Sequence, residues 1–180
     1  IRANSGSSYR FGVELELSWI LSEQWQWQSN LTLSENKNRD FFFERDGKLQ
    51  DLGDTNLSFS PNVVGGSQLS YSPTKDLTVG LFSKYVGEQY LSNIDSALSK
   101  LAAYSKQDIN IQYTISPSWC ESLQLQLLLN NVLNEEYTSN GYFYTYNDDW
   151  SNPSSITTIE GVGYYPQAGF HFLAGMKIRF

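Results

Sequence analysis

The side chains that could carry out chemistry in this sequence are few, and most lie toward its C-terminal end. The only histidine is His171. A hydrolytic site would need a serine nucleophile, an orienting carboxylate and an oxyanion site beside it. The sequence offers no ordered set of these groups, so we predict a structural histidine and no catalytic residues.

Three acids of the same region could bind a cation. Asp148, Asp149 and Glu160 offer the hard oxygen ligands that Ca²⁺ prefers, but the spacing of an EF-hand loop is missing. Acids in a solvated loop also occur without any ion. The single cysteine, Cys120, excludes an internal disulfide and cannot build a metal cluster. We therefore expect no metal and no cofactor.

A long segment, residues 134–167, is the most informative stretch for binding. Its aromatic residues are Tyr137, Tyr142, Phe143, Tyr144, Tyr146, Trp150, Tyr164 and Tyr165, and it has no Lys or Arg. Unstructured loops of this length are uncommon unless they are functional. Tyr and Trp offer rigid contact area with a polar tip, so we predict that Tyr142, Tyr144, Tyr146 and Trp150 contact a small-molecule ligand. The alternative is that these rings only pack on neighbouring loops.

The composition limits the kind of fold that positions these residues. The chain has 180 residues, 15% of them aromatic, and no stretch of apolar residues at helical spacing, so it is predicted to be all-β. No run of 18 apolar residues is present, which excludes a transmembrane helix but not transmembrane strands. The net charge of -7 argues against a nucleic-acid partner. Residues 1–11 lack a basic segment followed by an apolar core, so no signal peptide is expected.

The last residues show the clearest strand pattern. Phe170, Phe172, Ala174, Met176, Ile178 and Phe180 alternate with Gly169, His171, Leu173, Gly175, Lys177 and Arg179. The pattern predicts a strand of about thirteen residues. That length exceeds the usual five or six residues and suits a tilted crossing of a bilayer.

The alternation recurs six more times. Further strands are predicted over residues 9–19, 25–33, 57–72, 76–90, 108–115 and 123–130. The third is weaker and is interrupted by Pro61 and by Gly65 and Gly66, where a bulge or a bend is expected. The connections alternate between short turns and long loops, which is the wiring of an up-and-down outer-membrane barrel with short periplasmic turns and long extracellular loops. The long ones are residues 39–56, 93–104 and 134–167.

Charge and aromatic placement agree with this interpretation. The outward positions of the predicted strands hold no Lys, Arg, Asp or Glu, as lipid contact requires, because a charge there costs about 2–4 kcal/mol. The inward positions include Arg10, Glu14, Glu16, Lys84, Asp108, His171, Lys177 and Arg179. Trp19, Trp25, Trp27, Tyr71 and Trp119 lie beside the short turns, where an interfacial girdle is expected.

Three segments resemble the C-terminal third of TonB-dependent outer-membrane receptors. They are the turn and strand of residues 71–93, with Val86, Gly87, Gln89 and Tyr90 as a shared element; "LLLNNVLNEEYTSNGY" at residues 127–142; and the Pro-containing approach to a last strand ending in Phe, residues 164–180. The resemblance implies a portion of a 22-stranded barrel, about seven strands, whose plug domain, signal peptide and TonB-contacting segment are absent from this chain.

The resemblance also implies partners and roles. It predicts a bacterial outer-membrane receptor that binds an iron chelate, a vitamin or a glycan and imports it with energy from the TonB complex. Its partners would be outer-membrane lipid, its own plug domain and the remaining strands. Glu14, Glu16, Lys84, His171, Lys177 and Arg179 would face the lumen or the plug, Phe180 would be the assembly signal, and Tyr137 would be structural.

Three other functions remain open from the sequence. A small complete outer-membrane barrel would act as a pore or an anchor. An outer-membrane hydrolase would use His171. A soluble β-sandwich binding module would show a similar alternation, but with strands of about half this length.

Overall fold

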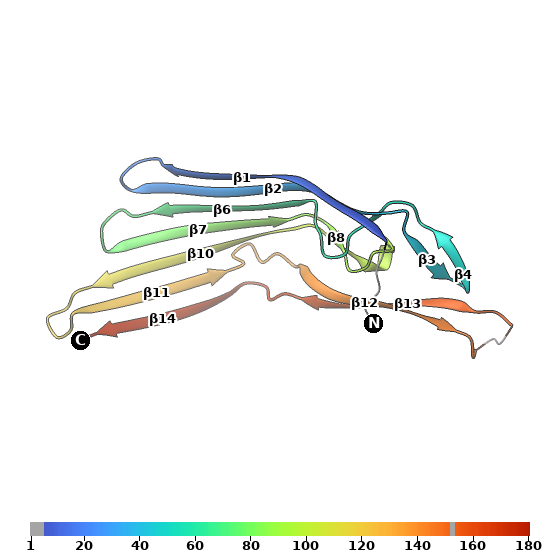
Figure 1. Ribbon diagram of the computed structural model, residues 1–180. Coiled ribbons are helices and arrows are strands. Elements are labelled where there is room, and N and C mark those ends of the chain that lie inside the picture. Colours follow the sequence, from blue (N-terminus) through green and yellow to red (C-terminus); the bar gives the residue numbers. More distant parts are fainter. Residues whose placement is uncertain (1–5, 152–153) are drawn as a thin grey trace.

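The computed structural model describes residues 6–151 and 154–180, and Figure 1 shows an extended, curved sheet of long strands. In chain order the main sheet contains β1 (Ser7–Ile20), β2 (Trp25–Arg39), β6 (Val63–Tyr71), β7 (Leu77–Val86), β10 (Tyr104–Ile115), β11 (Ser122–Asn130) and β14 (His171–Arg179). Neighbours in this order pair antiparallel, and β1 and β14 form the two edges.

This arrangement confirms the seven strands expected from the sequence. They form one meander and not two packed sheets, which contradicts the β-sandwich alternative, and the sheet is open, which contradicts a small closed barrel. Short turns join the strands at one end, and long excursions join them at the other (Figure 1). Within the described ranges, no helix is long and apolar enough to cross a membrane.

The two faces of the sheet differ as the alternation predicted. Cross-strand partners point to the same side of an antiparallel sheet. Glu14 is opposite Thr32, Glu16 is opposite Asn30 and Lys177 is opposite Gln124, so these side chains share a polar face. Apolar pairs such as Leu15 with Leu31 and Leu125 with Met176 form the other face.

Several predicted strand details are wrong. The strand predicted over residues 57–72 begins only at Val63, after Pro61, and no bulge is present at Gly65 and Gly66, because both pair with β2 in an unbroken register. The strand β2 extends six residues beyond Leu33, and this end carries Glu35, Lys37 and Arg39 on the face that Leu31 and Leu33 make apolar farther along, so it projects past the apolar band. The last strand begins only at His171, since the Oδ1 of Asn134 holds the Phe170 N–H at 2.9 Å.

Aromatic rings line the short-turn end of the sheet. The rings of Trp25 and Tyr71 stack with centroids 4.3 Å apart, and the indole N–H of Trp27 donates to Ser67 Oγ at 2.9 Å. Trp19 lies opposite Trp27 in the register. The rings therefore gather at one end of successive strands, which is the arrangement expected of an interfacial girdle.

The long excursions have structure of their own. They contain the hairpin of β3 (Phe42–Arg45) and β4 (Lys48–Asp51), the short strands β5 (Thr55–Asn56), β8 (Gln89–Tyr90) and β9 (Lys100–Leu101), the single turn η1 (Ala97–Ser99), and the hairpin of β12 (Thr138–Asp148) and β13 (Thr157–Pro166). Buried side chains of the described residues concentrate in these excursions and at the strand ends that they join, and many are polar: Asn38, Thr55, Ser99 and Asn131. The region is thus held together largely by hydrogen bonds.

Candidate functional site: a tyrosine ladder on the outer loops

The segment predicted as an irregular loop, residues 134–167, is instead a β-hairpin. Strands β12 and β13 pair over ten residue pairs, with one irregularity between Thr138 and Asn140. Residues 152 and 153, between the two strands in the sequence, lie outside the described ranges. The period of two in "YFYTY" therefore marks a strand, and it places alternate side chains on opposite faces.

Tyr142, Tyr144 and Tyr146 lie on one face and form a ladder that continues to Trp150. Successive ring centroids are 6.3, 6.4 and 5.7 Å apart, and the ring planes differ by 17°, 14° and 5°. Tyr165 of β13 joins at 6.0 Å from Tyr142. The four ladder residues keep between 43% and 64% of their surface exposed. The structure thus brings together all four residues predicted to contact a ligand.

Two glycines of β13 make room for the rings. Gly163 is opposite Tyr142 and Gly161 is opposite Tyr144, and a Cβ added at either position would overlap the facing ring. The rings of Tyr142 and Tyr144 therefore lie across the backbone of the partner strand. Because glycine leaves the strand uncovered, the rings are supported from below and remain open on their other side.

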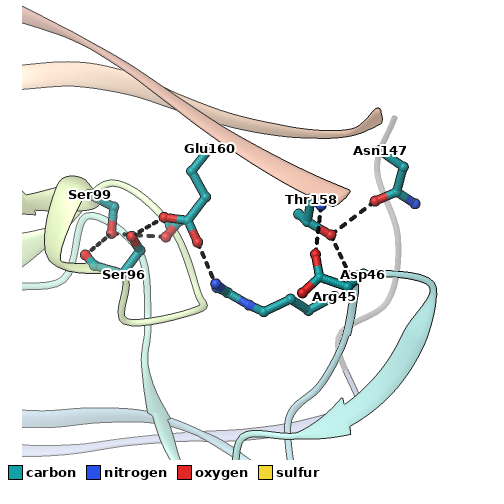
Figure 2. Close-up of polar contacts among 8 residues, drawn as sticks. Arg45, Asp46, Ser96, Ser99, Asn147, Thr158 and Glu160 are labelled. Carbon is teal, nitrogen blue, oxygen red and sulfur yellow. Dashed lines mark hydrogen bonds and ion pairs between the residues drawn. The ribbon is translucent and has the colours of Figure 1, made fainter. Parts of the chain in front are cut away.

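The other face of the hairpin is bound to neighbouring loops through Glu160 (Figure 2). One carboxylate oxygen lies 2.6 Å from the Arg45 Nη2 of β3, and the other accepts a hydrogen bond from the hydroxyl of Ser96. The Glu160 side chain is only 14% exposed. A single carboxylate therefore connects three loops, and charge-assisted bonds of this kind are about twice as strong as neutral ones.

A second contact lies beside the first. Asp46 and Thr158 exchange two bonds: the Asp46 N–H donates to Thr158 Oγ1 and the Thr158 N–H donates to Asp46 Oδ1, each at 2.7 Å. Thr158 also donates to Asn147 Oδ1 at 3.1 Å, and Tyr164 donates its hydroxyl to the Leu98 carbonyl at 2.7 Å. The β3–β4 hairpin and η1 thereby fix the orientation of the ladder.

We expect Glu160→Gln to loosen the ladder without preventing strand assembly. The change removes the ion pair and leaves the Arg45 guanidinium without its carboxylate, so hydrogen exchange of the β13 amides should speed up about tenfold, which corresponds to about 1.4 kcal/mol. Glu44→Gln is the matched control, because Glu44 makes one exposed contact to Asn147 at 3.3 Å. Equal exchange in the two variants would contradict an anchoring role for Glu160.

The base of the hairpin is organised by two asparagines of the "NNVLNEEY" segment. Asn131 is 2% exposed and bonds to both Glu135 and Ala168, and Asn134 bonds to Phe170. Tyr137 stacks on Tyr104 with centroids 4.3 Å apart, as its predicted structural role requires. The segment therefore closes the main sheet and begins the hairpin.

The residues predicted to face the lumen lie on the polar face of the main sheet. Glu16, Lys84 and Gly66 help to line a groove of about 810 Å³. Lys84 of β7 is opposite Lys106 of β10, and Lys106 forms a 2.7 Å ion pair with Asp108. Glu14, Lys177 and Arg179 share the same face. Their contact with a plug domain remains a prediction.

The geometry gives little support to catalysis at His171 or to a metal site in the hairpin. The His171 Nδ1 lies 2.9 Å from the Gly169 carbonyl oxygen, at the start of β14. Asp148 and Glu160 lie on opposite faces of the hairpin, so they cannot share an ion as the sequence allowed. Among the described residues, no group of three His, Cys, Asp or Glu side chains could hold a metal.

The fold and the two faces define a part of an outer-membrane β-barrel. A family model for the TonB-dependent receptor-like β-barrel matches residues 1–134. The chain belongs to this family. Members are outer-membrane receptors and transporters of Gram-negative bacteria, not enzymes, which agrees with the predicted class and contradicts the hydrolase alternative.

Solved structures of the same fold extend over nearly the whole chain. The siderophore receptor PiuA from Acinetobacter baumannii is 18% identical, with a TM-score of 0.62 and coverage of 94% of this chain and 22% of its own. The ferric yersiniabactin uptake receptor FyuA from Yersinia pestis is 19% identical, with a TM-score of 0.64 and coverage of 96% of this chain and 23% of its own. The ferric-catecholate import receptor Fiu from E. coli is 18% identical, with a TM-score of 0.65 and coverage of 94% of this chain and 20% of its own. The chain spans about a fifth of the length of these receptors, and a comparison with curated protein sequences gives no match.

Proposed function

We propose that this chain is the C-terminal barrel portion of a receptor that binds an iron chelate outside the cell and imports it with energy from the TonB complex. The observation that carries the proposal is the exposed row of Tyr142, Tyr144, Tyr146 and Trp150 on an anchored outer hairpin. Such a row offers a firm surface on which flat rings of a ligand can stack.

The polar face of the sheet fits a barrel whose lumen is filled by another domain. Glu14, Glu16, Lys84, Lys177 and Arg179 would contact a plug through ion pairs and water. The edges β1 and β14 carry unpaired backbone groups, which must be satisfied within a bilayer, so each would pair with a further strand of the receptor. Both contacts are part of the proposal.

The proposal is tested by iron uptake in cells that depend on this receptor. The full-length protein, expressed in an iron-starved host lacking its own chelate receptors, should support accumulation of radioactive iron from at least one ferric chelate. Inactivating TonB should abolish accumulation while leaving surface binding intact. Accumulation of a vitamin or a glycan in place of any iron chelate would contradict the proposed substrate class.

The role of Phe180 as an assembly signal remains a prediction. This residue follows β14 and is highly exposed. Its deletion from the intact receptor should reduce the amount of folded protein recovered in the outer-membrane fraction. An unchanged yield of folded protein in this fraction would contradict a role of Phe180 in assembly.

A further inference from the structure

The negative charge of the molecule is concentrated in its outer loops. Residues 34–62, 87–103 and 131–170 contain thirteen Asp and Glu but only five Lys and Arg, and the last of these ranges contains no Lys or Arg at all. The remaining residues are close to neutral. These loops therefore contribute a field at the ladder that attracts cations and repels anions.

Acidic groups also lie at the ladder itself. Asp148 ends β12 on the same face as Tyr146, and its Oδ1 accepts the N–H groups of Ser151 at 3.0 Å and Trp150 at 3.3 Å. These bonds, chiefly those from Ser151, hold the pKa of Asp148 below its ordinary value, so this carboxylate is charged at neutral pH. Asp149 follows directly.

Arg45, which lies beside the hairpin, does not offset these acids on the ladder face. Arg45 is paired with Glu160, whose side chain lies on the opposite face of the hairpin. The phenol rings are nearly parallel and about 6 Å apart, as the centroid distances show. Their faces are electron-rich, so they attract an electron-poor ring or a cation and repel an anion.

We infer that the ladder formed by Tyr142, Tyr144, Tyr146 and Trp150 binds an iron chelate that carries flat rings and has a neutral or positive net charge, and that it disfavours chelates with several negative charges. This inference rests on the proposed function and narrows its ligand class. Charge complementarity selects the occupant, and the spacing of the rings requires a ligand with a planar part. It separates this chain from receptors whose names specify ferric-catecholate, because tris-catecholate iron complexes are polyanions.

The test uses three ferric probes built on one backbone. They are a neutral tris-hydroxamate with aryl substituents, the same tris-hydroxamate without them, and an anionic tris-catecholate. Binding to the purified intact receptor is measured at low and at physiological salt. We expect the aryl hydroxamate to bind at least tenfold tighter than each of the other two. Added salt should narrow its advantage over the catecholate, because salt screens the repulsion.

A charge variant separates the acids from the rings. Asp148→Asn together with Asp149→Asn retains the turn-forming carbonyl oxygen and should raise catecholate affinity about threefold to tenfold, with little effect on the neutral probes. The inference would be overturned, and the proposed function kept, if the receptor bound the catecholate as tightly as the aryl hydroxamate. The same conclusion would follow if the ratio of these two affinities were unchanged in the Asp148→Asn, Asp149→Asn variant. If none of the three probes binds, the proposed function fails together with the inference.

Discussion

Replacing Tyr142, Tyr144 and Tyr146 together by alanine is expected to weaken ligand binding by the intact receptor about 100-fold. A stacked ring contributes about 0.5–1.5 kcal/mol beyond its buried area, so three rings account for about 3 kcal/mol, which corresponds to this factor. The rings are half exposed and lie outside the main sheet, so folding should be unaffected. Equilibrium binding and the yield of folded receptor measure the two effects.

Two further changes show whether the rings themselves are responsible. Tyr to Phe at the same three positions retains the rings and should retain most of the affinity. Gly161→Ala keeps every ring but places a methyl group where Tyr144 lies, so this ring must rotate away and binding should fall. Unchanged affinity in the triple alanine variant would show that the ladder only packs against other loops.

The main sheet could be predicted because its physical requirements are local. Lipid on one side and polar groups on the other impose a period of two, which is visible in segments such as Phe172 to Ile178. The alternation of short and long connections then determines the order of the strands. Strand ends were less certain, since the end of β2 and the start of β14 depend on contacts with distant loop residues.

The hairpin of β12 and β13 was predicted to contact a ligand, but it was not predicted to be a pair of strands. Its Asn, Gly, Asp and Pro residues are typical of loops, and they outweighed the alternation of Tyr142, Tyr144 and Tyr146. The glycines at 161 and 163 share this period and were the missed signal. The contact of Glu160 with Arg45 spans 115 positions, and a single sequence contains no pattern that links such distant residues.

Asn131→Ala should be the most destabilising single change in the outer region. The Nδ2 of Asn131 donates to the Glu135 carbonyl at 2.9 Å and the Ala168 carbonyl at 3.1 Å, and its Oδ1 accepts the Glu135 N–H at 2.9 Å. Three lost bonds at about 1 kcal/mol each, plus an alanine forced to a φ of 51°, give a loss of about 3–4 kcal/mol. The thermal unfolding midpoint of the intact receptor measures it.

Variants at the same position divide this loss into its parts. Asn131→Gly accepts the positive φ without strain, so it should be less destabilising than alanine and report the side-chain bonds alone. Asn131→Asp keeps the acceptor for Glu135 but loses both donors and adds a charge near Asp108, whose Oδ1 accepts the residue 131 N–H at 2.8 Å. It should therefore be at least as damaging as alanine.

The position of Asn131 explains why its loss should also reach the ladder. Residue 135 enters the hairpin and residue 168 leaves it, so one buried side chain holds both ends of β12 and β13 together. Glu160 anchors the same hairpin farther out, through contacts that do not involve Asn131. Asn131→Ala should then weaken ligand binding, while Asn134→Ala, which removes one exposed bond to Phe170, should do so far less. Equal effects of these two alanine variants on stability and binding would contradict the role of Asn131.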